Sequence, residues 1–144
     1  LERKKREYKP VLTHDVDTIQ KYPKFYSGSD EIAAKIIKNI EIPMSMKLTL
    51  QKIKSHIHYK YDPYNSFDYL MDLSESAGLQ SHFFFQIKGE TKFDNNYNRN
   101  TKFLLKIIEN IKNRGHAIGF HPSYNTYNSK KIWEKELELH LLHM

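Results

Sequence analysis

The chain has no cysteine among its 144 residues. That absence excludes a disulfide framework, a thiolate metal site and a cysteine nucleophile. It is typical of a reducing compartment, and export is also compatible with it. Glycine and proline are scarce as well, with five of each, beside 39% hydrophobic and 28% charged residues. Such a composition excludes collagen-like architecture and disorder throughout the chain.

The sequence also lacks a long hydrophobic run. No stretch approaches the roughly 18 consecutive apolar residues that a membrane-spanning helix needs. Residues 1–9 are charged rather than apolar, so they do not form a signal peptide. We therefore expect no membrane span, and the length suits a single domain over residues 1–144.

The charge is positive, with 23 basic against 17 acidic side chains and a net charge of +6. Lysines supply most of it and are scattered, and only residues 3–6 form a dense basic run. We interpret that run as a solvated tail. A nucleic-acid module is therefore a hypothesis based on charge alone, and it predicts steeply salt-dependent binding to any duplex.

The first third of the chain predicts a strand and one or two helices. Residues 10–13 form a short apolar run that enters a polar turn, as a strand does. Ser29 is a candidate N-cap for a helix with isoleucines on one face, and Pro43 lies at or just past its end. Residues 46–58 are ambiguous, because their apolar residues match helical spacing only loosely.

The remaining residues alternate clearly between helices and strands. The predicted order is a helix capped by Ser66 and ended by Gly78, a strand over 81–87, a helix from 100 or 101 to Gly115, a strand over 116–120, and a helix capped by Ser129. The helical positions expected to face the core are Phe67, Leu70, Leu73, Phe103, Leu104, Ile107, Ile108, Ile111, Ile132, Trp133, Leu137 and Leu141.

Alternation of this kind predicts parallel strands joined by crossover helices, hence an α/β sheet or barrel. Three parallel strands alone would leave two open sheet edges. We therefore expect that the chain either belongs to a larger domain or associates with itself as a homo-oligomer.

In α/β folds, functional side chains gather where the strands end. In extended geometry Asp15 and Asp17 project to one side and His14 and Val16 to the other. His121 ends the third predicted strand. Two carboxylates and an imidazole suit a divalent metal with a spare carboxylate as base. A capped turn and a hydrogen-bonded histidine are the structural alternatives.

Two segments carry a resemblance to a known family. Residues 11–17 read VLTHDVD, and residues 115–124 read GHAIGFHPSY. The pair resembles the motifs of polysaccharide deacetylases of the NodB-homology class, which are related to carbohydrate esterase family 4. The closest resemblance is to the branch found in bacterial surface-polysaccharide and O-antigen gene clusters. It extends over roughly residues 8 to 138.

The resemblance implies the N-terminal part of an irregular (β/α)7 barrel whose C-terminal motifs are missing from this chain. It also implies a divalent metal, zinc first, and hydrolysis of the N-acetyl group of an amino sugar. By position Asp15 matches the general base, and Asp17 and His121 match metal ligands. Asn125 stands where the family usually has a second ligand histidine, so we count it as a weak ligand.

Two function hypotheses follow from the resemblance. In the first, the chain is a bacterial, cytoplasmic N-deacetylase in which Asp15 accepts a proton from water activated by the metal. Its partner would be an N-acetylated carbohydrate of a surface polysaccharide or its precursor. In the second, favoured by Asn125, it is a pseudo-deacetylase that binds a glycan without turnover. Tyr124 and Tyr127 are candidates to stack on a sugar ring, and Asp94 is a candidate pocket residue.

The other histidines have structural interpretations. We expect His14 to bond a neighbouring strand and His116 to pack or support the site. His82 is expected to lie in the core. His140 and His143 are expected to be exposed at a helix end.

Overall fold

A computed structural model describes residues 10–23, 29, 32–33, 42–86, 89–95 and 101–143 of the chain. Strands and helices alternate along this part. In chain order they are β1 (Leu12–Val16), α2 (Ile42–Ile57), α3 (Phe67–Ser76), β2 (Ser81–Gln86), α4 (Lys102–Asn113), β3 (Ala117–His121) and α5 (Lys130–His143). Two 3-10 turns, η1 (Tyr59–Tyr61) and η2 (Tyr124–Asn128), follow α2 and β3.

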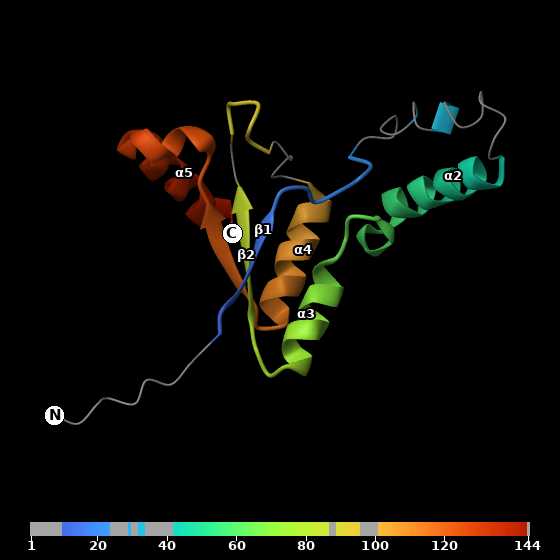
Figure 1. Cartoon of the computed structure of the whole chain (residues 1–144), viewed down its shortest axis with the longest axis horizontal. Helices are drawn as coiled ribbons and strands as arrows, with labels where there is room; N and C mark the ends of the chain where they lie inside the picture. Colours follow the sequence, from blue (N-terminus) through green and yellow to red (C-terminus); the bar gives the residue numbers. More distant parts are fainter. Residues whose placement is uncertain are drawn as a thin grey trace.

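The strands form one parallel sheet in the order β1-β2-β3. Each strand is joined to the next by a connection that contains a helix, as parallel pairing requires. Figure 1 shows α3 and α4 side by side on one side of the strands, while α5 lies next to β3 and α2 extends away from the sheet. The α/β prediction is therefore confirmed, as a three-stranded parallel sheet with helices.

The core lies between the central strand β2 and the helices α3 and α4. Phe83 and Phe85 of β2 are completely buried. The residues that pack with them are Val16, Ile19, Phe67, Met71, Leu104, Ile107, Ile108 and Ile111. The predicted apolar face of α4 is thus confirmed, and its burial supplies the main hydrophobic stabilisation of the sheet.

The opposite face of the sheet carries Thr13, Asp15, His82, Phe84 and Gly119. The first two side chains are exposed, and His82 and Phe84 are partly buried. The ring of Phe84 lies over Gly119, where a Cβ atom would come within 2.5 Å of the ring carbons Cδ1 and Cε1. Glycine at this position therefore lets an aromatic ring cover the neighbouring strand.

Most helix ends follow the sequence signals, but Ser66 precedes α3 without making a side-chain cap hydrogen bond. Thr101 caps α4, and its side chain accepts a hydrogen bond from the N–H of Leu104 at 3.2 Å. Gly78 and Gly115 have φ values of 68° and 76°, in the left-handed region that favours glycine. Both glycines end their helices with the paired main-chain bonds of a Schellman motif, such as Leu79 N–H to Ser74 O at 2.9 Å.

Near the N-terminus the structure corrects one prediction. The first strand is Leu12–Val16 rather than 10–13, because His14 and Val16 pack against the helix-covered side of the sheet and extend the pairing. Pro43 lies in the first turn of α2, where the missing N–H of proline costs nothing, and its relation to the helix predicted before it stays a prediction. The helix predicted from Ser29 to residue 40 lies largely outside the described residues.

Three predicted core positions are exposed: Leu73, Trp133 and Leu141, at 57%, 41% and 73%. In α3 the buried face instead passes through Phe67, Met71 and Ser74. In α5 the buried side chains are polar. They are Glu136 and His140, so the expectation that His140 is exposed was wrong. Apolar spacing alone did not reveal which face these helices turn inward.

No helix in the described ranges is both long and apolar enough to span a lipid bilayer.

Candidate functional site

The end of β1 separates its side chains onto two sides as predicted. His14 stacks on the ring of Phe83, with centroids 4.9 Å apart, and Val16 is buried in the core. Asp15, between them, is exposed. Asp17 follows the strand and is also exposed, and its Oδ1 accepts a hydrogen bond from Asn95 Nδ2 at 2.9 Å. Two accessible carboxylates therefore stand where β1 ends.

His121 ends β3 at the same edge of the sheet. Its Nδ1 lies 3.0 Å from the carbonyl oxygen of Pro122. Because a carbonyl can only accept, Nδ1 carries a proton, so the tautomer with the lone pair on Nε2 is the one that fits this contact. Histidine ligands of metals are held in this way, with one nitrogen donating to a carbonyl and the other facing the ion.

The sheet register relates these groups to each other. Val16 pairs with Phe85, and Gln86, the next residue of β2, pairs with His121. Asp17 therefore follows β1 at the level of Gln86 and His121. Two strand spacings place its Cα about 10 Å from that of His121. Two side chains and an ion between them can close such a gap, with ligand distances of about 2 Å.

Asp94 is the most heavily bonded group at this edge. Its Oδ1 accepts from Gln86 Nε2 at 2.8 Å and from the N–H of Tyr124 at 2.7 Å. Its Oδ2 accepts from the N–H groups of Glu90 and Thr91 and from the Thr91 hydroxyl. One carboxylate thus joins the end of β2, the loop after it and the segment after β3.

Hydrogen bonds favour the ionised form of the Asp94 carboxyl group. Burial opposes its charged form, but the bonds from the Tyr124 main chain and from Thr91 outweigh that effect and lower the pKa of Asp94 to about 2. Asn95 extends the same network, since its N–H donates to Gln86 Oε1 at 2.7 Å while its side chain holds Asp17. Neither Gln86 nor Asn95 was predicted from the sequence as a residue of the site. The local signal for Gln86 was that a polar residue ends an otherwise apolar strand.

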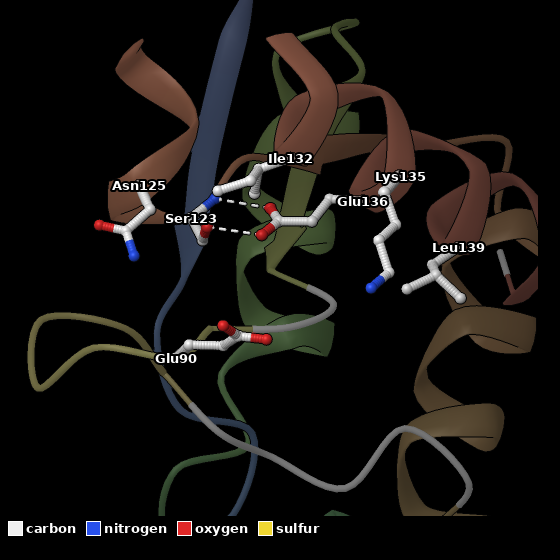
Figure 2. Close-up of a pocket in the computed structure, with 7 residues that line it drawn as sticks. All are labelled: Glu90, Ser123, Asn125, Ile132, Lys135, Glu136 and Leu139. Carbon is white, nitrogen blue, oxygen red and sulfur yellow. Dashed lines mark hydrogen bonds between the residues drawn. The ribbon is translucent and has the colours of Figure 1, made fainter. Parts of the chain in front are cut away.

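Asn125 lies in a different setting. It lines a cavity of about 120 Å³ together with Glu90, Ser123, Ile132, Lys135, Glu136 and Leu139 (Figure 2). Buried Glu136 accepts from the N–H and hydroxyl of Ser123 at 3.0 and 2.5 Å, which fastens α5 to the segment after β3. In Figure 2 the Asn125 amide points away from that carboxylate. Its role as a ligand stays a prediction.

The donor chemistry of the edge suits a divalent ion, but the site is sparse. Across the ranges that the structure describes, no three His, Asp or Glu side chains are grouped to hold a metal ion. Asp17 and His121 remain as the donors that could hold zinc, an oxygen and an imidazole nitrogen. Water or other ligands would have to supply the rest of its coordination shell.

Exposed aromatic rings border this edge. Phe93 and Tyr124 lie 4.9 Å apart between ring centroids, and Tyr124 and Tyr127 lie 5.8 Å apart. Their exposed fractions are 65%, 54% and 77%. Asp94 holds both ends of the first pair in place, because it bonds the main chain of Tyr124 and directly follows Phe93. The three rings form an exposed aromatic cluster in which Tyr127 lies edge-on to Tyr124.

His14 and His116 make hydrogen bonds that join strands and helices. His14 Nε2 bonds the hydroxyl of Ser81 on the neighbouring strand at 2.9 Å, as predicted. Buried His116 accepts from the N–H of Ser81 and bonds Glu75 at 3.0 Å. Hydrogen bonds from Arg114 and then from His116 lower the pKa of Glu75 to about 2. These groups join α3, β2 and β3 at the edge where the strands begin.

No protein-family model, curated protein sequence or solved structure matched the chain.

Proposed function

We propose that the chain is the N-terminal part of a bacterial, cytoplasmic metal-dependent carbohydrate N-deacetylase with an irregular (β/α)7 barrel fold. Its substrate would be an N-acetylated amino sugar of a surface polysaccharide or of its precursor. The observation that carries this proposal is His121, whose Nδ1 is bonded to a carbonyl so that Nε2 keeps its lone pair at the strand ends where Asp15 and Asp17 stand. The parallel sheet supports the barrel.

Each residue has a distinct task in this proposal. Asp17 and His121 would hold the ion, which supplies Lewis-acid activation of the acetamide and of water. Asn95 orients Asp17 through its hydrogen bond, and Pro122 orients His121. Exposed Asp15 accepts the proton of the attacking water, because it is the second carboxylate of the same strand end and has no ligand role.

A second candidate is glycan binding without turnover. It is favoured by the rings of Phe93, Tyr124 and Tyr127, which are exposed beside the site, and by the sparse donor set. Apolar ring faces of this kind suit the C–H faces of a sugar. The two candidates differ in what Asp15 does, since only hydrolysis needs its proton transfer.

The metal site is tested first, by calorimetry with zinc on the wild-type chain and on Asp17→Ala and His121→Ala. We expect micromolar or tighter binding, weakened at least about tenfold by either change, since even supporting groups around a metal ligand are worth that much. His56→Ala is the matched control, because His56 Nδ1 also lies 2.9 Å from a main-chain carbonyl, that of Lys52. Equal losses in all three variants, or no zinc binding by the wild type, would refute the site.

The chemistry is tested with Asp15→Asn and N-acetylated amino-sugar oligosaccharides. Hydrolysis predicts release of acetate by the full-length protein that contains this chain, and a loss of about 100-fold or more in its Asp15→Asn variant with zinc binding retained. Glycan binding without turnover predicts no acetate from either protein and equal glycan affinity. Acetate release that is unchanged in Asp15→Asn would contradict the role of this residue.

A further inference from the structure

Helix α2 has two faces of opposite character. Leu48, Lys52 and Ser55 are buried, and the Ser55 hydroxyl donates to Asp62 at 2.6 Å, so this face is anchored to the segment after η1. A second face presents large apolar side chains to solvent. They are Met46, Leu50, Ile53 and Ile57, with exposed fractions of 62%, 56%, 44% and 75%.

These four residues, here called the α2 stripe, follow one another at spacings of four, three and four. That spacing places them on one face of the helix over about 16 Å of its length. Single exposed apolar residues are ordinary, but a continuous row of them marks a surface that is covered in use. In Figure 1 α2 extends away from the sheet.

The charges around the α2 stripe define what can cover it. None of the sixteen residues of α2 is acidic. Exposed Lys47 and Lys54 border the stripe and, with Tyr61, help to line a hollow of about 610 Å³ over Met46 and Leu50. The occupant must therefore be apolar where it meets the stripe and anionic at its margins.

A second copy of this chain fits that description poorly. Another α2 would bring lysine against lysine. Exposed leucines also occur on α3, α4 and α5. Arg114 already pairs with the acidic side chains of α3, α4 carries three lysines against one glutamate, and α5 places lysines beside its exposed glutamates, as Lys130 beside Glu134 at 3.5 Å. A bilayer surface fits better, because it takes up an apolar row of any length and its anionic headgroups lie beside the acyl chains. Tyr61, 58% exposed, suits the level of the headgroups.

We propose that α2 is an interfacial helix that places the α2 stripe in the surface of an anionic membrane while Lys47 and Lys54 contact the headgroups. The helix lies in the plane of the surface and does not cross it. This proposal is independent of the deacetylase site, which lies at the strand ends.

The test is co-sedimentation of the whole chain with lipid vesicles at about 0.1 M salt, where screening acts over about 10 Å. We expect binding to vesicles that mix phosphatidylglycerol with phosphatidylcholine, and much weaker binding to phosphatidylcholine alone. Leu50→Asp should weaken binding to the anionic vesicles at least about tenfold, since it removes a leucine side chain that would lie in the apolar layer of the membrane. Leu105→Asp is the matched control, because Leu105 is 51% exposed on α4, away from the stripe.

A second variant covers the case in which Leu50→Asp does not fold. Lys47→Gln, with the stripe intact, should weaken binding to the anionic vesicles about fivefold and leave binding to phosphatidylcholine unchanged. No binding of the wild type, or equal effects of Leu50→Asp and Leu105→Asp, would overturn the proposal. A wild-type dimer that Leu50→Asp turns into a monomer would also overturn it, in favour of self-association through α2.

Discussion

The side chain that organises the candidate site is Asp94, which accepts five hydrogen bonds from Gln86, Glu90, Thr91 and Tyr124. Neither the proposed base nor a proposed ligand is held so firmly. The positions of the exposed rings of Phe93 and Tyr124 therefore depend on the Asp94 carboxylate, which has no chemical role in the proposed reaction. We infer that Asp94 positions the edge of the sheet that carries the proposed site.

The first prediction concerns Asp94→Asn. Asparagine keeps one acceptor oxygen. Its NH₂ group would face the two N–H groups and the hydroxyl that now donate hydrogen bonds to Oδ2. We expect a loss of about 1–3 kcal/mol in the free energy of unfolding, measured in urea. Asp72→Asn is the control, since it breaks a surface ion pair with Arg114 and should cost at most about 1 kcal/mol. Equal losses would contradict the special role of Asp94.

The difference in unfolding free energy between the wild type and Asp94→Asn should depend on pH in a defined direction. The pKa of Asp94 is lowered to about 2 in the folded chain, against about 3.9 for a free aspartate. Its stabilising contribution is therefore complete above pH 4 and is lost as the pH falls toward 2. The difference between wild type and Asp94→Asn should shrink over that interval, and a constant difference would exclude an ionised Asp94 as its cause.

Among the secondary-structure elements, α5 is unusual because the side chains that it buries are polar. Its buried side chains are Glu136 and His140, and it contacts β3 through the rings of Trp133 and His140 against Phe120. His140 Nδ1 is buried with no hydrogen-bond partner among the described residues. A leucine of similar size would fill the same space without an unbonded polar atom.

We therefore expect His140→Leu to stabilise the chain by about 1 kcal/mol at neutral pH. Burial lowers the pKa of His140, so the unfolded chain binds a proton more readily and stability falls as the pH drops below about 6.5. That loss should be smaller in His140→Leu than in the wild type. Thermal unfolding at pH 7 and pH 5 measures both effects. Destabilisation at neutral pH would show that the imidazole makes a bond that stabilises α5.

At the scale of the whole molecule, the sheet has two open edges in the part that the structure describes. β1 and β3 each pair with β2 alone. Unpaired N–H and C=O groups along a strand are templates for pairing with another chain. Val11, 62% exposed, directly precedes β1 and adds apolar surface to that edge.

The chain is therefore expected to self-associate in a concentration-dependent way. Val11→Lys should shift the equilibrium toward the monomer about tenfold, because a lysine at a strand edge opposes edge-to-edge pairing. Sedimentation velocity at several concentrations measures the shift, with Leu105→Lys on α4 as a control for charge. A monomer at every concentration would show that these edges do not pair.

The α/β class of the fold and most of its elements could be predicted from local patterns in the sequence. Caps such as Thr101, the glycines 78 and 115, and the apolar spacing of α4 are local signals, and the structure confirms them. Local signals also placed Asp15 and Asp17 away from Val16, since alternation along a strand depends only on neighbouring residues.

Only the tertiary structure decided the rest. The face that α5 buries and the Asp94 network both depend on contacts between distant segments, such as Asp94 with Tyr124. The relation of Asp17 to His121 likewise follows from the register of β1, β2 and β3. Spacing along the chain does not encode which distant group a polar side chain will meet, because that partner is set by how the strands pair and the helices pack.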